Sequence, residues 1–143
     1  MEITVTKLSD SEHRITVQRA DGSQESKTLN SRSFLFHDIA HLAVEKVLPI
    51  RAGFWGSVAQ GARLDSSDCD GADVMLAESL AGPIQVLIKR DAAITAYQQV
   101  LARVLPEHQG LPELAAQIHE EARKLKGQWR ATPYGDSMTL HWS

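Results

Sequence analysis

The chain has little cysteine: Cys69 is the only one among 143 residues. A single thiol excludes a disulfide within the chain and a cysteine-based zinc cluster. The neighbouring Asp68 and Asp70 favour the protonated thiol, which is a poor nucleophile, so a catalytic cysteine is not expected. Any metal site must therefore be built from His, Asp or Glu side chains.

Long apolar stretches are also missing from the sequence. None approaches the roughly 20 residues that a membrane-spanning helix needs. The amino-terminal segment MEITVTKLSD lacks the basic region followed by an apolar one that marks a secretion signal. We therefore expect a soluble, cytoplasmic protein that makes no membrane contact.

No excess of positive charge is present, because 15 basic residues are set against 18 acidic ones, for a formal net charge of -3. This balance provides no global attraction to a phosphate backbone, so nucleic acid is not an expected partner. One segment, 123–130, mixes basic residues with Trp129 as nucleic-acid surfaces do. The end of a helix attracts the same cations, and this is the interpretation we favour.

Glycine-rich phosphate loops are absent as well. Gly53, Gly56 and Gly61 bracket a short predicted helix. They lack the trailing Lys-Ser/Thr of a P-loop and the Gly-x-Gly start of a dinucleotide turn. No nucleotide site is expected.

Strand patterns occur at both ends of the chain. Ile3 and Val5, and then Ile15 and Val17, alternate with polar residues at a period of two, and Asp21-Gly22 provides a hairpin turn. The polar segment 23–29 is then predicted to return as an edge strand. Near the carboxyl terminus, segments 129–132 and 137–142 flank a turn and are predicted to be extended.

Helical spacing dominates the middle of the chain. Apolar residues recur every three or four positions in 33–48, and a short helix is predicted at 52–61. A third helix is expected to end at Gly82-Pro83, after an acidic capping loop at 62–73. Asp91 is the expected N-cap of the next helix, and the last helix is expected to run from Pro112 to Gly127. The segment 84–88 is open between strand and helix, with helix favoured.

These elements predict an α+β fold. Strands from the two ends of the chain are expected to form an antiparallel sheet, which a central segment of four to five helices covers. A chain of this length buries roughly two thirds of its unfolded surface, and we find no internal repeat or long linker. Residues 1–143 are therefore predicted to form a single domain.

The most chemically suggestive feature lies on the helix predicted at 33–48. His37, His41 and Glu45 are spaced four residues apart, and Asp38 lies on the same side. Imidazole and carboxylate groups that converge above one helix face can bind a divalent transition metal. The alternative, which we favour, is an ordinary solvent-facing helix surface.

The stretch FLFHDIAH resembles the His-Asp helix of the HD-domain phosphohydrolases, in which an apolar run precedes adjacent metal-binding His and Asp residues. The resemblance covers eight residues. That family also implies a His on an earlier helix and a later Asp, whereas His13 lies in a predicted strand and Asp91 is a loose match. No Glu follows the first His as in HEXXH metalloproteases. We transfer no activity from either family.

Two functional hypotheses follow, and the sequence leaves catalysis undecided. The favoured one is a non-enzymatic module that binds a protein partner or a second copy of itself, with Phe54 and Trp55 as contact residues, although core packing is the commoner use of such a pair. The alternative is a metal-binding protein or metal-dependent hydrolase that uses His37, His41 and Glu45. The acidic residues of 65–73 lack EF-hand spacing and are interpreted as a turn.

Overall fold

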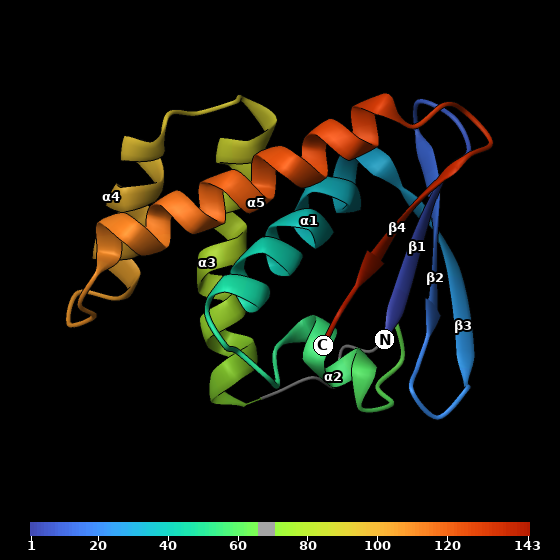
Figure 1. The fold of residues 1–143 in the computed structure, drawn as a ribbon, viewed down its shortest axis with the longest axis horizontal. Coiled ribbons are helices and arrows are strands. Elements are labelled where there is room, and N and C mark those ends of the chain that lie inside the picture. Colours follow the sequence, from blue (N-terminus) through green and yellow to red (C-terminus); the bar gives the residue numbers. More distant parts are fainter. Residues whose placement is uncertain (66–70) are drawn as a thin grey trace.

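The fold was analysed in a computed structural model that describes residues 1–65 and 71–143. Three strands open the chain, five helices follow, and one strand closes the described part (Figure 1). The elements are β1 (Glu2–Lys7), β2 (Glu12–Gln18), β3 (Gln24–Asn30), α1 (Ser31–Val47), α2 (Phe54–Ala59), α3 (Ala72–Lys89), α4 (Ile94–Val104), α5 (Leu111–Ala131) and β4 (Ser137–His141). Asp68, Cys69 and Asp70 belong to the acidic capping loop predicted at 62–73, and they lie outside the described residues.

The sheet is antiparallel with the strand order β3-β2-β1-β4, so strands from the two ends of the chain pair directly. Ile3 lies opposite Val17 on one side and Leu140 on the other. Val5 is paired in the same way with Ile15 on β2. Their apolar side chains face one side of the sheet, which is buried, as the period-two pattern predicts.

The expected edge strand is confirmed. Among the described strands, β3 pairs with β2 alone, and it alternates between exposed and half-buried residues. The turn before it uses Gly22 at φ 86°, a conformation that glycine adopts at no steric cost. Asp21 accepts hydrogen bonds from the backbone N–H and hydroxyl of Ser23, which fixes this turn.

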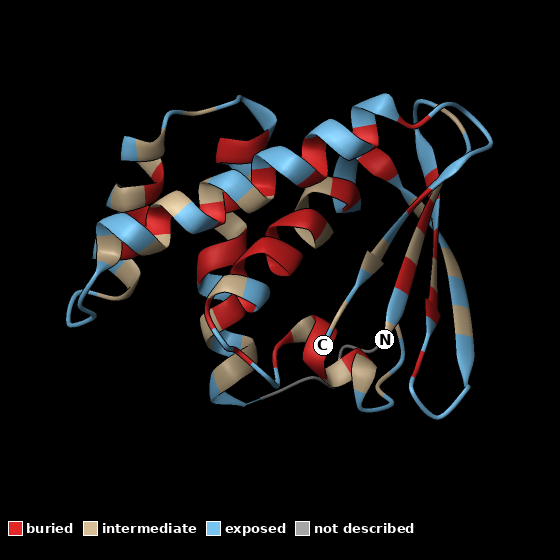
Figure 2. Cartoon of the chain, viewed as in Figure 1, coloured by how far each residue is buried: buried red, intermediate tan, exposed pale blue. Residues whose placement is uncertain are grey.

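The helices lie on one side of the sheet. Figure 1 shows α1 and α5 running side by side next to the strands, with α3 and α4 farther from the sheet. α1 packs against α3 and α5 and also contacts β2 and β3, so it is the central helix of the molecule. Figure 2 shows buried residues along the inner faces of α1, α3 and α5. The α+β architecture predicted from the sequence is therefore confirmed.

One predicted helix boundary is wrong. Gly82-Pro83 does not end the third helix, because α3 continues through Pro83 to Lys89. A proline inside a helix removes one hydrogen bond, but Leu80, Ile84 and Leu87 continue a single buried stripe across it. Burial of this stripe stabilises the uninterrupted helix. The preference for helix at 84–88 is confirmed.

Two further local predictions are also wrong. Asp91 does not cap α4, whose N-cap is Ala93, because Asp91 adopts φ 51° and pairs with Lys126 instead. The segment 129–132 is not a strand, since α5 runs past Gly127 to Ala131. Trp129 is buried in this last turn, edge-on to the ring of His13, and that burial holds the helix beyond the glycine. Among the described residues no helix is long and apolar enough to cross a membrane.

Candidate functional site

The histidines of α1 are placed by a helix that begins with a well-formed cap. The Asn30 side chain accepts hydrogen bonds from the backbone N–H groups of Arg32 and Ser33, and this stabilises the first turn. Leu35 and Ile39 anchor the buried face. His37 lies between these two anchors, and His41 and Glu45 follow on the next turns. Their side chains contact residues of α2 and α3.

His41 is completely enclosed, with a side chain only 1% exposed. Its Nδ1 lies 2.9 Å from Glu45 Oε2, and its Nε2 lies 3.0 Å from Glu78 Oε1. Burial by itself lowers the pKa of this imidazole, but the hydrogen bond and charge of Glu45, together with Glu78, outweigh burial and raise the pKa above its ordinary value. His41 is thus held between two carboxylates.

His37 has a matching environment one helical turn earlier. Its Nδ1 lies 3.2 Å from the side-chain oxygen of Gln85, and its Nε2 lies 3.5 Å from Glu78 Oε2. The two imidazole rings meet edge to face, with centroids 4.7 Å apart. In both histidines, therefore, Nδ1 faces a supporting oxygen, and Nε2 faces Glu78.

Glu78 is the member of this group that the sequence did not reveal. It lies on α3, and its side chain is 51% exposed, so its carboxylate covers the solvent side of both rings. His37, His41 and Glu78 each offer a ligand atom within 4.8 Å of the others. They form the one such group of three among the described residues, and we call it the His-His-Glu cluster. Glu78 is 37 positions away from His41, and only the packing of α3 on α1 brings them together.

Glu45, a predicted metal ligand, has other partners. Its side chain is fully buried, and its two oxygens accept hydrogen bonds from the backbone N–H groups of Phe54 at 2.9 Å, Trp55 at 3.0 Å and Gly56 at 3.4 Å. These are the first amides of α2, which have no partner inside the helix. Glu45 therefore caps α2 from a distance and orients His41. It is not a member of the His-His-Glu cluster.

The two glycines that bracket this turn are needed for close approach. A Cβ atom built on Gly53 would lie 2.5 Å from Glu45 Cδ, and one built on Gly56 would lie 1.9 Å from the carbonyl oxygen of Arg51. Real Cβ atoms do not come so close to other heavy atoms. The segment Gly53-Phe54-Trp55-Gly56 is therefore a backbone cradle for the Glu45 carboxylate, which we call the Glu45 cradle.

Asp38, the fourth predicted ligand, is half-buried beside the cluster and is not one of its three members. Burial raises the pKa of its carboxyl group to about 7, and the negative charge of Glu78 adds to this effect. The charges of His41 and Lys27 oppose the shift. Asp38 is thus a proton-carrying group near the cluster.

The aromatic pair on α2 is divided between two environments. Trp55 is 1% exposed, and its indole N–H donates to the backbone carbonyl of Asp38 at 3.2 Å, which is core packing. Phe54 is half-buried, with its ring centroid 5.7 Å from that of His41, so it forms one wall beside the cluster. Partner binding through this pair stays a prediction, and Phe54 is the residue available for it.

The electrostatics of the cluster follow from its hydrogen bonds. When each Nδ1 donates its proton to Glu45 or Gln85, each Nε2 carries a lone pair directed toward the Glu78 carboxylate. In that tautomer, two lone pairs and a carboxylate face one another, and a cation between them would stabilise the arrangement. A proton on each Nε2 is one way to relieve the repulsion, and a single bound metal ion is another.

Comparison with protein-family models, curated proteins and solved structures yields no match for the chain. No family match therefore supports the local resemblance of FLFHDIAH to the HD-domain helix. His13 and Asp91, the other positions considered for that family, lie outside the His-His-Glu cluster. What the chain does must be argued from its own geometry.

Proposed function

We propose that the protein binds one divalent transition-metal ion through His37, His41 and Glu78. The observation that carries the proposal is the arrangement of the two imidazoles: each has Nδ1 against an oxygen acceptor and Nε2 facing the same carboxylate. Metal-binding histidines are characteristically held in this way, because the second nitrogen is fixed by a carboxylate or carbonyl oxygen.

The donor set limits the kind of ion. Two imidazole nitrogens and one carboxylate oxygen suit zinc and iron(II) and are poorly matched to calcium and magnesium, which prefer oxygen ligands. Three protein ligands leave at least one coordination position for water or a substrate. Glu78 lies on the exposed side, so that position would open toward solvent. This ligand count is typical of catalytic rather than structural zinc sites.

Glu45 has a supporting role in the proposal. Its contact with His41 Nδ1 holds the ring orientation and, in the neutral imidazole, favours the tautomer with its proton on Nδ1, which leaves the lone pair on Nε2. The Glu45 cradle fixes that carboxylate with three backbone amides. Carboxylate, histidine and metal would then form a chain that begins in the core and ends at the surface.

Metal-dependent hydrolysis is a second candidate function, and the half-buried Asp38 favours it. A partly buried carboxylate beside the cluster could accept a proton from a metal-activated water, and the charge of the bound ion would hold that carboxylate ionised for the role. The interaction-module hypothesis receives less support, since Trp55 is in the core. Self-association stays a prediction, which the mass of the protein in solution would test.

The metal proposal is tested by titrating chelator-treated protein with zinc, iron(II) and manganese, with binding followed by calorimetry and by metal analysis after dialysis. One equivalent of zinc or iron(II) is expected to bind per chain. Glu78→Gln is expected to weaken binding by more than the roughly 10–100-fold that loss of a supporting residue causes.

Glu120→Gln is the matched control, because Glu120 is an exposed glutamate on α5 whose side chain is 75% exposed. This variant is expected to bind metal like the unmodified protein. The proposal is wrong if no ion binds stoichiometrically, since the cluster would then be a protonated histidine between carboxylates. Equal affinity of the two variants would also exclude Glu78 as a ligand.

A further inference from the structure

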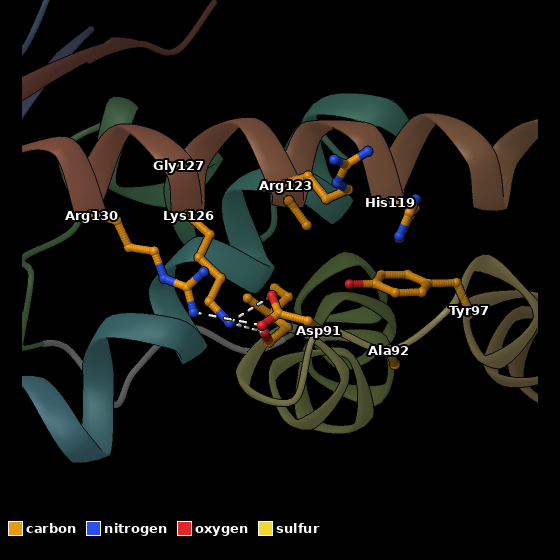
Figure 3. Close-up of a pocket in the computed structure, with 10 residues that line it drawn as sticks. Asp91, Ala92, Tyr97, His119, Arg123, Lys126, Gly127 and Arg130 are labelled. Carbon is orange, nitrogen blue, oxygen red and sulfur yellow. Dashed lines mark hydrogen bonds and ion pairs between the residues drawn. The ribbon is translucent and has the colours of Figure 1, made fainter.

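A separate cavity of about 400 Å³ lies where the end of α3 and the start of α4 meet α5 (Figure 3). Cavities of about this size commonly hold small ligands. Its polar lining consists of Asp91, Tyr97, His119, Arg123, Lys126 and Arg130. Apolar side chains, among them Ile88 and Ala122, complete the wall.

The lining is positively charged in a protein that is negatively charged as a whole. Arg123, Lys126 and Arg130 oppose the single carboxylate of Asp91, while the chain carries a formal net charge of -3. All three basic residues come from one face of α5. A local excess of cations inside a concave surface raises the concentration of anions there.

Lys126 accounts for most of the neutralisation of Asp91. Its side chain is 7% exposed, and Nζ donates to Asp91 Oδ1 at 2.9 Å and to the backbone carbonyls of Ile88 at 2.6 Å and Lys89 at 3.2 Å. This hydrogen bond and the charges of Lys126 and Arg130 hold the pKa of the Asp91 carboxyl below its usual range. Lys126 thus caps backbone carbonyl groups at the end of α3, and its three N–H donors all have acceptors within the protein.

The two arginines, in contrast, remain available. Arg130 reaches Asp91 only at 3.5 Å, and Arg123 reaches Glu120 only at 3.9 Å. Their side chains are 65% and 69% exposed, and such loose surface pairs contribute little binding energy. Each guanidinium has five N–H donors in a planar arrangement that matches the oxygens of a carboxylate or phosphate.

Tyr97 adds a neutral hydrogen-bond donor to this lining. The residue is 2% exposed, and its ring packs edge-on against His119 with centroids 5.0 Å apart. Figure 3 shows its hydroxyl pointing into the cavity, and this hydroxyl takes part in none of the hydrogen bonds formed among the described residues. Burial raises the pKa of Tyr97 to about 12, so the group stays an O–H donor. The hydroxyl is therefore a donor on the cavity wall that an oxygen of a ligand could accept.

We propose that this cavity binds the anionic head of a small organic acid. The Tyr97 hydroxyl and the guanidinium groups of Arg123 and Arg130 would donate hydrogen bonds to the head-group oxygens. The apolar wall and the Tyr97 ring would contact the body of the molecule. Phosphate and carboxylate heads share this chemistry, and the two are separated by the test below.

The cavity is distinct from the His-His-Glu cluster. Glu78 and Ile88 are ten residues apart on α3, which corresponds to roughly 15 Å along the helix axis. No residue of the cluster lines this cavity. The anion proposal can therefore fail while the metal proposal stands, and the reverse is also true.

The test is a two-dimensional ¹H–¹⁵N NMR titration of the full chain at constant ionic strength, with inorganic phosphate, phenyl phosphate and benzoate as probes. Saturable shifts are expected in the amides of 91–97 and 119–130. Tighter binding of phenyl phosphate than of benzoate would assign a phosphate head, and the reverse order would assign a carboxylate head. Tighter binding of phenyl phosphate than of inorganic phosphate would support the apolar wall.

Tyr97→Phe removes only the hydroxyl, so the fold is expected to persist while the affinity for the tighter probe falls about tenfold. Arg123→Gln and Arg130→Gln are each expected to reduce affinity by about the same factor. Lys124→Gln is the matched control, because Lys124 lies on the same helix, carries the same charge and does not line the cavity.

The proposal is overturned if none of the three probes gives saturable shifts at these amides. It is also overturned if Lys124→Gln weakens binding as much as Arg123→Gln does, because the attraction would then depend only on total charge. Unchanged affinity in Tyr97→Phe would likewise contradict it, since the hydroxyl would make no contact with the ligand.

Discussion

The two sides of the His41 ring show how one residue can belong to both the core and a candidate binding site. On the Nδ1 side, Glu45 has no exposed side-chain surface and accepts three backbone hydrogen bonds. On the Nε2 side, Glu78 is half-exposed, and among the described residues its carboxylate pairs only with His41 and His37, which are themselves proposed ligands. Identical carboxylates at nearly identical distances therefore have different roles, and burial decides which is which.

The largest effect is expected from Glu45→Gln, which removes the charge from the buried side. The amide would leave His41 and part of the Glu45 cradle without an acceptor. Loss of one partner in a buried charged network costs about 3–5 kcal/mol. Urea unfolding should show a decrease of this size in the free energy of unfolding. A decrease below about 1 kcal/mol would mean that the two carboxylates do not differ in the way proposed.

A slightly smaller effect is expected when the cradle itself is altered. Gly56→Ala places a methyl group against the Arg51 carbonyl oxygen, and forced overpacking of this kind costs roughly 3 kcal/mol. Gly82→Ala is the control, since a Cβ there meets nothing within 4 Å and a helical Gly→Ala change stabilises by about 0.5–1 kcal/mol. The midpoint temperature of thermal unfolding should therefore fall in Gly56→Ala and rise in Gly82→Ala.

A second buried histidine, His13, sharpens the comparison, because no carboxylate of the described residues pairs with either of its ring nitrogens. His13 is fully buried, with Nδ1 3.0 Å from the Ser31 hydroxyl and with Nε2 unpaired, and burial lowers its pKa to about 4. A histidine whose folded pKa lies below the unfolded value of 6.5 loses stability as the pH falls from 6.5 toward 4. The loss between pH 7 and pH 5 should be about 2 kcal/mol.

The measurement for His13 is the free energy of unfolding at pH 7 and pH 5 in the unmodified protein and in His13→Phe. The variant keeps an aromatic ring against Trp129 but cannot take up a proton. Between pH 7 and pH 5, the free energy of unfolding of His13→Phe should decrease by about 2 kcal/mol less than that of the unmodified protein. An identical decrease in both proteins would show that His13 is not responsible.

The smallest effect on stability is expected at Glu78. The Glu78 carboxylate is 51% exposed, so water can take its place at His41, and Glu78→Gln, which keeps one acceptor oxygen, should lower the free energy of unfolding by only about 1 kcal/mol. The same variant should nevertheless lose metal affinity. A large destabilisation by Glu78→Gln would make this carboxylate a structural group like Glu45 and would remove the distinction between the two sides.

The sequence predicted the architecture because its hydrophobic periods were strong and local. The alternation of Ile3, Val5, Ile15 and Val17 with polar residues was sufficient to predict the buried face of the sheet. The helical spacing of apolar residues was sufficient to predict α1. The boundary at Pro83 was missed because the burial of the α3 stripe outweighs the local cost of a proline.

The candidate site was only partly predictable for a related reason. His37 and His41 share a helix face by spacing alone, so they could be identified. Glu78 comes from another helix, and no local pattern indicates that this single glutamate of α3 faces α1. The role of Glu45 was obscured because a carboxylate that caps a distant helix has the same spacing as one that binds a metal.

The most direct test of the account is the position of a bound zinc ion, located by anomalous diffraction at the zinc absorption edge in crystals grown with one equivalent of zinc. We predict one strong anomalous peak in contact with His37 Nε2, His41 Nε2 and a Glu78 carboxylate oxygen, with Glu45 still bound to the amides of α2. A peak coordinated by Glu45 instead of Glu78, or no peak at this cluster, would contradict the central claim.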